Sequence, residues 1–368
     1  MQNIFFKSLL PTLKQSNDEE KIEILKKQCF LKEGMNYFDW TASGLAASCV
    51  EKRIKSILPF YANMHSESSK HSEIISEIYE KSRQVIRTCL NIDESFAIIS
   101  CGFGSSSAIK KFQELMGIYI PPKTKQAIKD SMQSIELPLV LIGPFEHHSN
   151  ELSFREGLCE VYRTPLKKDG LIDLQALEAT LKQNAKRKII ASFALGSNVT
   201  GLIAPFAEIS NLVRKYGGII CYDMASSSAY FDIPSSFYDA AFLSPHKLLG
   251  GVCSSGILII KRALVDKTLP PTFSGGGVVG YVSRTSVQYF ANEEIREEAG
   301  TPGILEFMRA ALAYLLRNEI GTDWILKRKQ KLIEEFRAFL NNQKNILSYG
   351  NLNYNFLGIF SFNITGKS

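Results

Sequence analysis

Five short apolar runs, each ending in a polar cluster, constrain the fold of this chain more than any other feature. They span residues 96–101, 137–142, 189–195, 219–222 and 240–243, and helical stretches at 107–117, 173–184 and 205–216 lie between them. Continuous apolar runs of this length are typical of strands buried on both faces of a parallel sheet. Their alternation with helices predicts an α/β domain with right-handed crossovers, in which helices cover both faces of a mostly parallel sheet.

The polar clusters that follow these runs predict one shared site. In chain order they read GFGSSS, GPFEHHSN, GSNVTG, DMASSS and SPHK. In open α/β sheets, ligands bind beyond the carboxyl ends of the strands. We therefore expect the five clusters, which are far apart in sequence, to converge on one crevice.

Three of the clusters have a structural explanation beside a functional one. The GFGSSS stretch (102–107) suits phosphate binding at a helix N-terminus, but an ordinary Gly/Ser helix cap has the same sequence. Asp223 follows an apolar run and is either a helix cap or a buried counter-ion for a cation. His147 and His148 are both candidates to stack on a flat ring, although a single histidine is more often structural.

Lys247, in the SPHK cluster, decides between these explanations. A lysine amine forms a Schiff base with an aldehyde cofactor, and burial lowers the pKa of such an amine into a useful range. A phosphate cradle, a carboxylate for a pyridinium nitrogen, a stacking ring and this amine together describe a pyridoxal 5'-phosphate site.

The chain resembles the class V aminotransferases, a family of fold type I pyridoxal phosphate enzymes, and within it the cysteine desulfurase and selenocysteine lyase branch. The resemblance runs from about residue 37 to 303 and continues weakly beyond. The motifs that carry it are YFDWTASG (37–44), YANMHSESS (61–69), GFGSS (102–106), EHHSN (146–150), SNVTG (197–201), DMAS (223–226), SPHK (244–247), GGG (275–277) and REEAGTP (296–302).

The resemblance implies a role for each matching residue. Lys247 would hold the cofactor as an internal aldimine and move the substrate α-proton, Asp223 would pair with the ring nitrogen, and His147 would stack on the ring. Arg296 and Thr301 would lie near the rim of the site. The residues implied to bind the cofactor are Ser105, Ser106, His147, Asn198, Asp223, Ala225, Ser226, Ser244, His246 and Lys247.

The same resemblance implies a small amino acid as substrate and a homodimer in which the GGG segment (275–277) lies near the partner's site. It leaves three functions open: a cysteine desulfurase or lyase, a class V aminotransferase or epimerase, or a catalytically impaired, cofactor-binding dimeric scaffold. The scaffold is considered because this chain has no match for two C-terminal family residues, the sulfur-accepting cysteine and the arginine that binds the substrate carboxylate. No cysteine follows Cys253, and Ser226 stands where many members have glutamine.

Composition narrows the class of protein further. The net charge is +6, with basic residues scattered rather than in a dense stripe, so we expect no nucleic-acid partner. Seven cysteines without CxxC spacing predict neither a zinc site nor a disulfide framework, and favour the cytoplasm. We expect no membrane span and no bound metal.

The predicted domains are an N-terminal helical segment (1–36), a cofactor-binding domain (37–303), and a linking helix with an incomplete α/β small domain (304–368).

Overall fold

A computed structural model describes residues 2–64, 68–128, 136–351 and 353–366. The described chain divides into two compact units. Unit 1 combines residues 1–108, 228–232 and 243–322, and unit 2 combines residues 109–227, 233–242 and 323–368. Unit 2 contains five parallel strands, and unit 1 contains an antiparallel pair of strands. The domain boundaries expected from the sequence stay a prediction.

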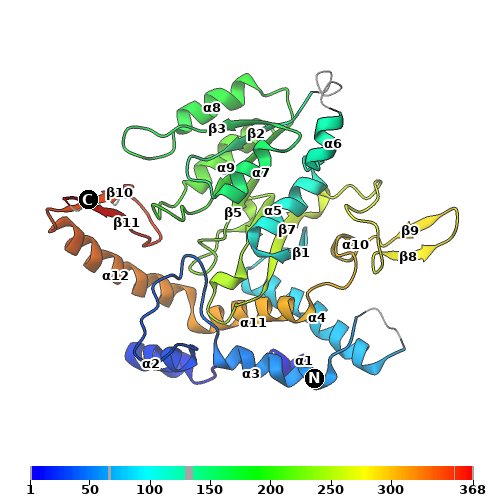
Figure 1. The fold of residues 1–368 in the computed structure, drawn as a ribbon, viewed down its shortest axis with the longest axis horizontal. Coiled ribbons are helices and arrows are strands. Elements are labelled where there is room, and N and C mark those ends of the chain that lie inside the picture. The colour runs from blue at the N-terminus through cyan, green and yellow to red at the C-terminus, as the bar shows by residue number, and fades with distance from the viewer. Residues whose placement is uncertain (1, 65–67, 129–135, 352, 367–368) are drawn as a thin grey trace. The chain divides into compact units, whose positions relative to one another are not determined.

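The five strands of unit 2 are all parallel, in the order β6-β5-β4-β2-β3 (Figure 1). Their bounds are β2 Leu139–Ile142, β3 Glu160–Arg163, β4 Ile189–Ala194, β5 Ile219–Asp223 and β6 Ala240–Leu243. Four of them are predicted runs, and β2, β4 and β6 are buried along almost their whole length. The predicted α/β fold with a mostly parallel sheet is thus confirmed. Strand β3 was not predicted, because its residues are partly exposed and it begins and ends with a charged residue.

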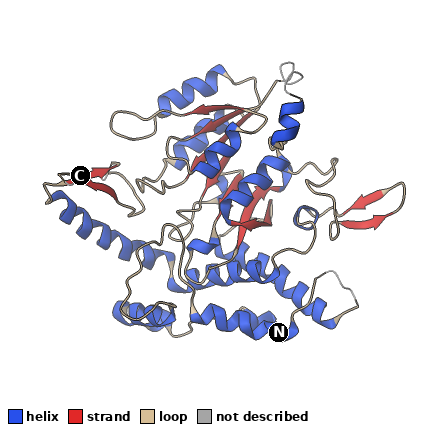
Figure 2. Ribbon diagram, viewed as in Figure 1, coloured by secondary structure: helices blue, strands red, loops and turns tan. Residues whose placement is uncertain are grey.

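Helices α7, α8 and α9 cover the sheet of unit 2, and α5 and α6 precede β2 (Figure 2). The bounds are α5 Gly104–Leu115, α6 Pro122–Ala127, α7 His148–Arg155, α8 Leu174–Gln183 and α9 Phe206–Lys215. The predicted helices therefore exist, with ends within about three residues of those expected. The Asp173 side chain caps α8 by accepting the N–H groups of Gln175 and Ala176.

The C-terminal part of the chain divides between the units: residues 243–322 belong to unit 1 and residues from 323 onward to unit 2. The predicted linking helix is two helices, α11 Ile304–Ile320 and α12 Thr322–Asn341, separated at Gly321, whose φ of 92° ends the first helix. Strands β10 Ile346–Tyr349 and β11 Ser361–Ile364 form an antiparallel pair. Between them, the N–H of Leu357 donates to the carbonyl of Gly201, and Phe356 and Leu357 are buried.

Unit 1 contains β1 Phe96–Phe103 and β7 Ser255–Lys261, which pair antiparallel. Of the five predicted runs, β1 is thus the one that lies in an antiparallel pair, which a mostly parallel sheet allows. Its partner β7, an apolar run that was not predicted, decides the direction of pairing. Helix α4 Lys70–Cys89, buried along one face, packs against the mostly buried α11 in this unit, beside α3 Ser48–Ile57. Residues 65–67 of the YANMHSESS motif lie outside the described residues.

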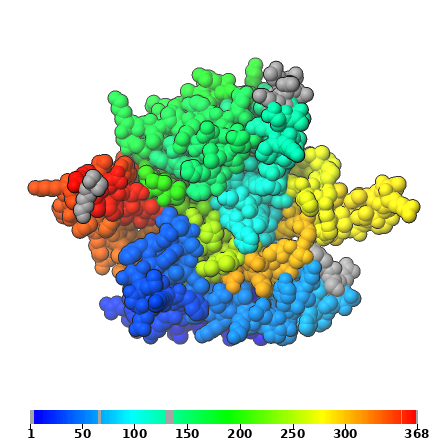
Figure 3. Space-filling model, viewed as in Figure 1, coloured from blue at the N-terminus to red at the C-terminus, as the bar shows by residue number. Residues whose placement is uncertain are grey.

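Three further helices and a hairpin complete unit 1. Helix α1 spans Gln2–Phe5 and α10 spans Glu293–Glu297. Helix α2 Asp18–Gln28 begins at a capping box, in which Asn17 and Glu20 bind each other's backbone N–H groups. Strands β8 Val279–Val282 and β9 Val287–Tyr289 form a hairpin that projects from its unit (yellow in Figure 3).

Buried ion pairs hold the REEAGTP segment against the core of unit 1. Glu298 accepts two hydrogen bonds from the Arg83 guanidinium, at 3.0 and 3.1 Å, and one from the Tyr79 hydroxyl at 2.9 Å. Arg296 is 3% exposed and donates to the carbonyl of Leu269 at 2.6 Å. Arg296 therefore lies in the interior of unit 1, and its expected place near the rim of the site stays a prediction.

The described residues contain neither a candidate membrane-spanning helix nor a candidate metal-binding cluster. None of the helices in that part of the chain combines the length and apolarity needed to cross a membrane. Within the same residues, no group of three or more His, Cys, Asp or Glu side chains is placed to hold a metal ion.

Candidate active site

The predicted site residues of unit 1 meet at one turn. Lys247 ends a short 3-10 helix, Pro245–Lys247, directly after β6, and its N–H donates to the carbonyl of Ser244 at 3.0 Å. The Ser244 hydroxyl accepts the N–H of Ser105, at the start of α5, at 2.8 Å. The glycine loop (102–106) and the SPHK turn (244–247) are therefore in contact, as expected from the sequence.

Close packing fixes this turn. Gly104 has a φ of 65°, and a side chain there would meet the His246 ring at 3.2 Å. A side chain at Gly251 would approach the carbonyl oxygen of Pro245 to 1.9 Å. Gly251 therefore requires glycine, since a Cβ would displace the backbone next to Lys247, whereas Gly104 favours glycine because of its positive φ.

Electrostatics suit this end of unit 1 to an anion. The exposed Ser106 and the buried Ser105 lie in the first turn of α5, where backbone N–H groups and the helix dipole favour negative charge. Burial, together with the neighbouring Lys247, lowers the pKa of His246 below its ordinary value. His246 is therefore a neutral hydrogen-bonding group at neutral pH.

The predicted site residues of unit 2 lie after β2, β4 and β5. Asp223 is 4% exposed at the end of β5, and one of its carboxylate oxygens accepts the N–H of Ala225 at 3.0 Å. The Ser226 hydroxyl donates to the carbonyl of Gly196 at 2.5 Å, in the loop that carries the half-buried Asn198. The loops after β4 and β5 are therefore joined, and the Ser226 hydroxyl is already used as a donor.

His147 lies at the N-terminus of α7. It is exposed, and its Nδ1 accepts the N–H of Ser149 at 3.2 Å, so it caps the helix. An Nδ1 that accepts leaves the ring proton on Nε2. His148, the other candidate, is the first residue of the helix, with its ring centroid 6.0 Å from that of His147.

Two residues close to His147 in the sequence were not predicted as part of the site. The side chains of Glu146 and Asn150 are buried and hydrogen-bond to each other. The signal was present in EHHSN, because a spacing of four residues places two polar side chains on one face of a helix start.

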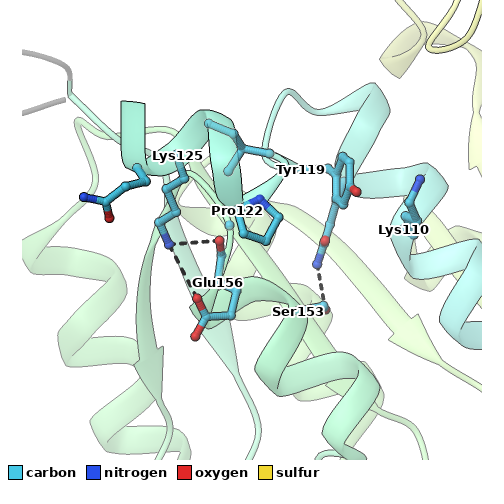
Figure 4. Close-up of a pocket in the computed structure, with 10 residues that line it drawn as sticks. Lys110, Tyr119, Pro122, Lys125, Ser153 and Glu156 are labelled. Carbon is cyan, nitrogen blue, oxygen red and sulfur yellow. Dashed lines mark hydrogen bonds and ion pairs between the residues drawn. The ribbon is translucent and has the colours of Figure 1, made fainter. Parts of the chain in front are cut away.

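A separate hollow of unit 2 lies away from these clusters. Its volume is about 820 Å³, and the parts of α5, α6 and α7 that line it are mostly apolar (Figure 4). The buried Gln113 amide donates to the Ser153 hydroxyl at 2.8 Å, and Lys125 donates to the carbonyl of Glu156 at 2.9 Å. The residues that line it are Lys110, Gln113, Tyr119, Ile120, Pro122, Lys125, Gln126, Ser153, Glu156 and Gly157, and no predicted site residue is among them.

Comparison with known proteins agrees with this arrangement. The family model for Aminotransferase class-V matches residues 36–368. The chain belongs to the class V aminotransferase family. Membership in this family implies an enzyme that depends on pyridoxal phosphate.

Individual relatives of this class V chain are named cysteine desulfurases. It is 27% identical to a probable cysteine desulfurase of Pyrococcus abyssi, over 93% of this chain and 82% of that protein. Its fold is similar to the apo structure of a cysteine desulfurase from Thermococcus onnurineus, with a TM-score of 0.78 and 23% identity, covering 94% of this chain and 82% of that one. A cysteine desulfurase from Escherichia coli aligns with a TM-score of 0.73 and 18% identity, covering 94% and 83%.

Proposed function

We propose that this chain is a pyridoxal 5'-phosphate enzyme that acts on a small amino acid, with a reaction of the cysteine desulfurase or lyase type. Family membership and the names of its relatives support the proposal. The observation that carries it is the Ser244–Lys247 turn, which places an amine three residues after a hydroxyl that contacts the glycine loop.

The residues around this turn fit the phosphate end of the cofactor. Hydroxyl groups and a helix N-terminus are suitable phosphate ligands, and a Cβ at Gly104 would lie against the His246 ring and the Ser244 hydroxyl, at 3.2 and 3.7 Å. The residues that we propose bind the phosphate are Ser105, Ser106, Ser244 and His246.

The residues of unit 2 fit the ring end. A buried carboxylate such as Asp223 suits a protonated ring nitrogen, because the two charges compensate each other out of water. His147 is proposed to stack on the ring, with Ala225 on the other face. Asn198 and Ser226 are proposed to lie near the phenolic oxygen, although the hydroxyl of Ser226 already donates to Gly196 and is left to accept.

The cofactor supplies an electron sink for bonds at the substrate α-carbon. The amine of Lys247 would bind the aldehyde in the resting enzyme and afterwards move the α-proton. The carboxylate of Asp223 would keep the ring nitrogen protonated, and the Nε2–H of His147 would be available as a proton donor.

A homodimer and a cytoplasmic location complete the proposal. Three apolar side chains of the projecting β8–β9 hairpin, Tyr281, Val282 and Val287, are 58%, 58% and 48% exposed, which suits a surface covered by a second copy. The GGG segment (275–277) directly precedes this hairpin. All seven cysteines are free thiols, as is usual in a reducing compartment.

The absorption spectrum tests the proposal. The purified chain, loaded with pyridoxal phosphate, is expected to show an absorption band at about 420 nm. Lys247→Ala is expected to lose or shift this band. Lys52→Ala, which removes an exposed lysine of α3, is the control and is expected to keep it. Added cysteine is expected to change the band and to give alanine, and an added thiol reductant such as dithiothreitol is expected to release the removed sulfur as sulfide.

The products also separate the alternatives. A keto acid that keeps the substrate's side chain, formed without release of sulfide or ammonia, would indicate transamination. A band that no amino acid changes would indicate a scaffold. A folded protein that takes up no cofactor would contradict the proposal itself.

A further inference from the structure

The carboxyl group of Glu146 joins three separate segments of unit 2. Its Oε1 accepts the N–H of Gly143, just after β2, at 3.1 Å and the N–H of Ala194, the last residue of β4, at 2.8 Å. Its Oε2 accepts the Asn150 side-chain amide, in α7, at 2.5 Å. Glu146 is only 9% exposed, so these N–H groups have little access to water as an alternative partner.

The carboxyl group of Glu146 is closely packed and belongs to a larger polar network. A side chain at Gly143 would meet the Glu146 oxygen at 2.4 Å. Asn150 is fully buried, and its Oδ1 accepts the hydroxyl of Ser192, in β4, at 2.7 Å. Glu146, Asn150 and Ser192 therefore form a buried polar network, and such networks fix one conformation when all their members are satisfied.

This network lies on both sides of His147 in the sequence. His147 is exposed, and its ring is held by the bond from Ser149 N–H to Nδ1. Its backbone carbonyl accepts the N–H of Asn150 at 2.8 Å. Glu146 and Asn150 are both buried and hydrogen-bonded. The turn between them, which carries the His147 imidazole, is therefore held in one conformation.

The same network reaches the backbone of Asp223. Ala194, whose N–H binds Glu146, lies opposite Asp223 in the β4–β5 pairing. The next residue, Leu195, donates its N–H to the carbonyl of Asp223 at 2.9 Å. The end of β4 thus lies directly between Glu146 and Asp223.

We propose that Glu146 is a positioning residue, which acts through Asn150 on the His147 imidazole and through Ala194 on Asp223. This inference rests on the proposed function, which gives the two side chains their roles at the cofactor ring. Burial of a carboxyl group is costly, and at this place it satisfies three N–H groups that an apolar side chain would leave unpaired.

The experiment compares Glu146→Ala with Glu146→Gln in the full chain. Alanine removes every acceptor, whereas glutamine keeps an oxygen for Gly143 and Ala194. Glu156→Gln, at the exposed C-terminal end of α7, is the matched control. One readout is the imidazole ¹⁵N spectrum of the cofactor-free protein, with His147 assigned by a His147→Gln variant. The other is the dissociation constant for pyridoxal phosphate, followed by absorbance.

The wild type is expected to show the Nε2–H tautomer at His147. Glu146→Ala is expected to shift this signal toward mixed tautomers and to weaken cofactor binding about tenfold, while Glu156→Gln stays within about twofold. Glu146→Gln keeps the acceptor for Gly143 and Ala194 but loses the one for Asn150, so it is expected to shift the imidazole signal with a smaller loss of cofactor affinity. A folded Glu146→Ala protein with the wild-type imidazole spectrum and the wild-type dissociation constant would overturn the proposal.

Two other experimental outcomes also test the proposal. If Glu146→Ala does not fold, Asn150→Ala, which keeps the bonds to Gly143 and Ala194, is judged by the same imidazole shift. If the wild type binds no cofactor, the proposed function fails, whereas the tautomer of His147 in the cofactor-free protein still decides whether Glu146 positions it.

Discussion

The backbone N–H of Ser105 donates to the hydroxyl of Ser244 at 2.8 Å, across 139 residues of sequence. Both residues are buried, so the bond is protected from water. It joins the first turn of α5 to the turn that carries Lys247. The proposed phosphate ligands and the proposed Schiff-base lysine are thereby held in one arrangement before any ligand binds.

Ser244→Ala is expected to lower the free energy of unfolding by about 1–3 kcal/mol, because the N–H of Ser105 is left buried without this acceptor. Urea unfolding of the cofactor-free protein measures the change. Ser56→Ala, which removes an exposed hydroxyl of α3, is the control and is expected to stay within about 0.5 kcal/mol. Equal effects of the two substitutions would contradict this interpretation of the bond.

Glu298→Ala is expected to destabilise the protein by about 3–5 kcal/mol, because it leaves the guanidinium of Arg83, 2% exposed, buried without its main counter-ion. Thermal and urea unfolding both measure the loss. Glu73→Ala is the control, since it breaks an exposed ion pair with Lys70 and is expected to leave the unfolding midpoint almost unchanged. A small effect of Glu298→Ala would show that water reaches Arg83.

Stability is expected to fall as pH rises from about 4.5 to about 8, because of Glu146. Burial raises the pKa of Glu146 from 4.5 to about 8, and the Asp223 carboxylate adds to the rise, although the N–H donors oppose it. In this window the folded protein keeps a proton that the unfolded chain has lost, so its stability decreases as the proton is removed.

Glu146→Gln removes this titration. The free energy of unfolding of the wild type, relative to Glu146→Gln, is expected to drop by about 2–4 kcal/mol between pH 5 and pH 8.5. Urea unfolding at several pH values measures it. Parallel pH profiles for the two proteins would refute the raised pKa.

Cys253→Gly is expected to stabilise the protein by about 0.5–1 kcal/mol. Cys253 has a φ of 59°, a left-handed conformation that costs side chains energy and that glycine adopts freely. The melting temperature measures the gain. Cys253→Ala removes the same thiol but keeps a Cβ, so it should give no gain, and stabilisation by both variants would point to the thiol instead.

Much of the fold could be predicted because its signals are local. The runs that became β2, β4, β5 and β6 are short and apolar, and the helices between strands follow ordinary start and stop signals. The failures have physical causes. Strand β3 is partly exposed and so has no apolar run, and the antiparallel direction of β1 depends on β7, a partner about 150 residues away.

The candidate site divides in the same way. From its residue types alone, the sequence determined that a lysine, a carboxylate, a glycine loop and a histidine follow successive apolar runs, and these identify the family and its cofactor. Only the tertiary structure decided that Ser244 receives the N–H of Ser105, that the hydroxyl of Ser226 is used by Gly196, and that Glu146 binds both Gly143 and Ala194. These contacts join residues distant in sequence, or depend on burial and side-chain direction, which local patterns do not specify.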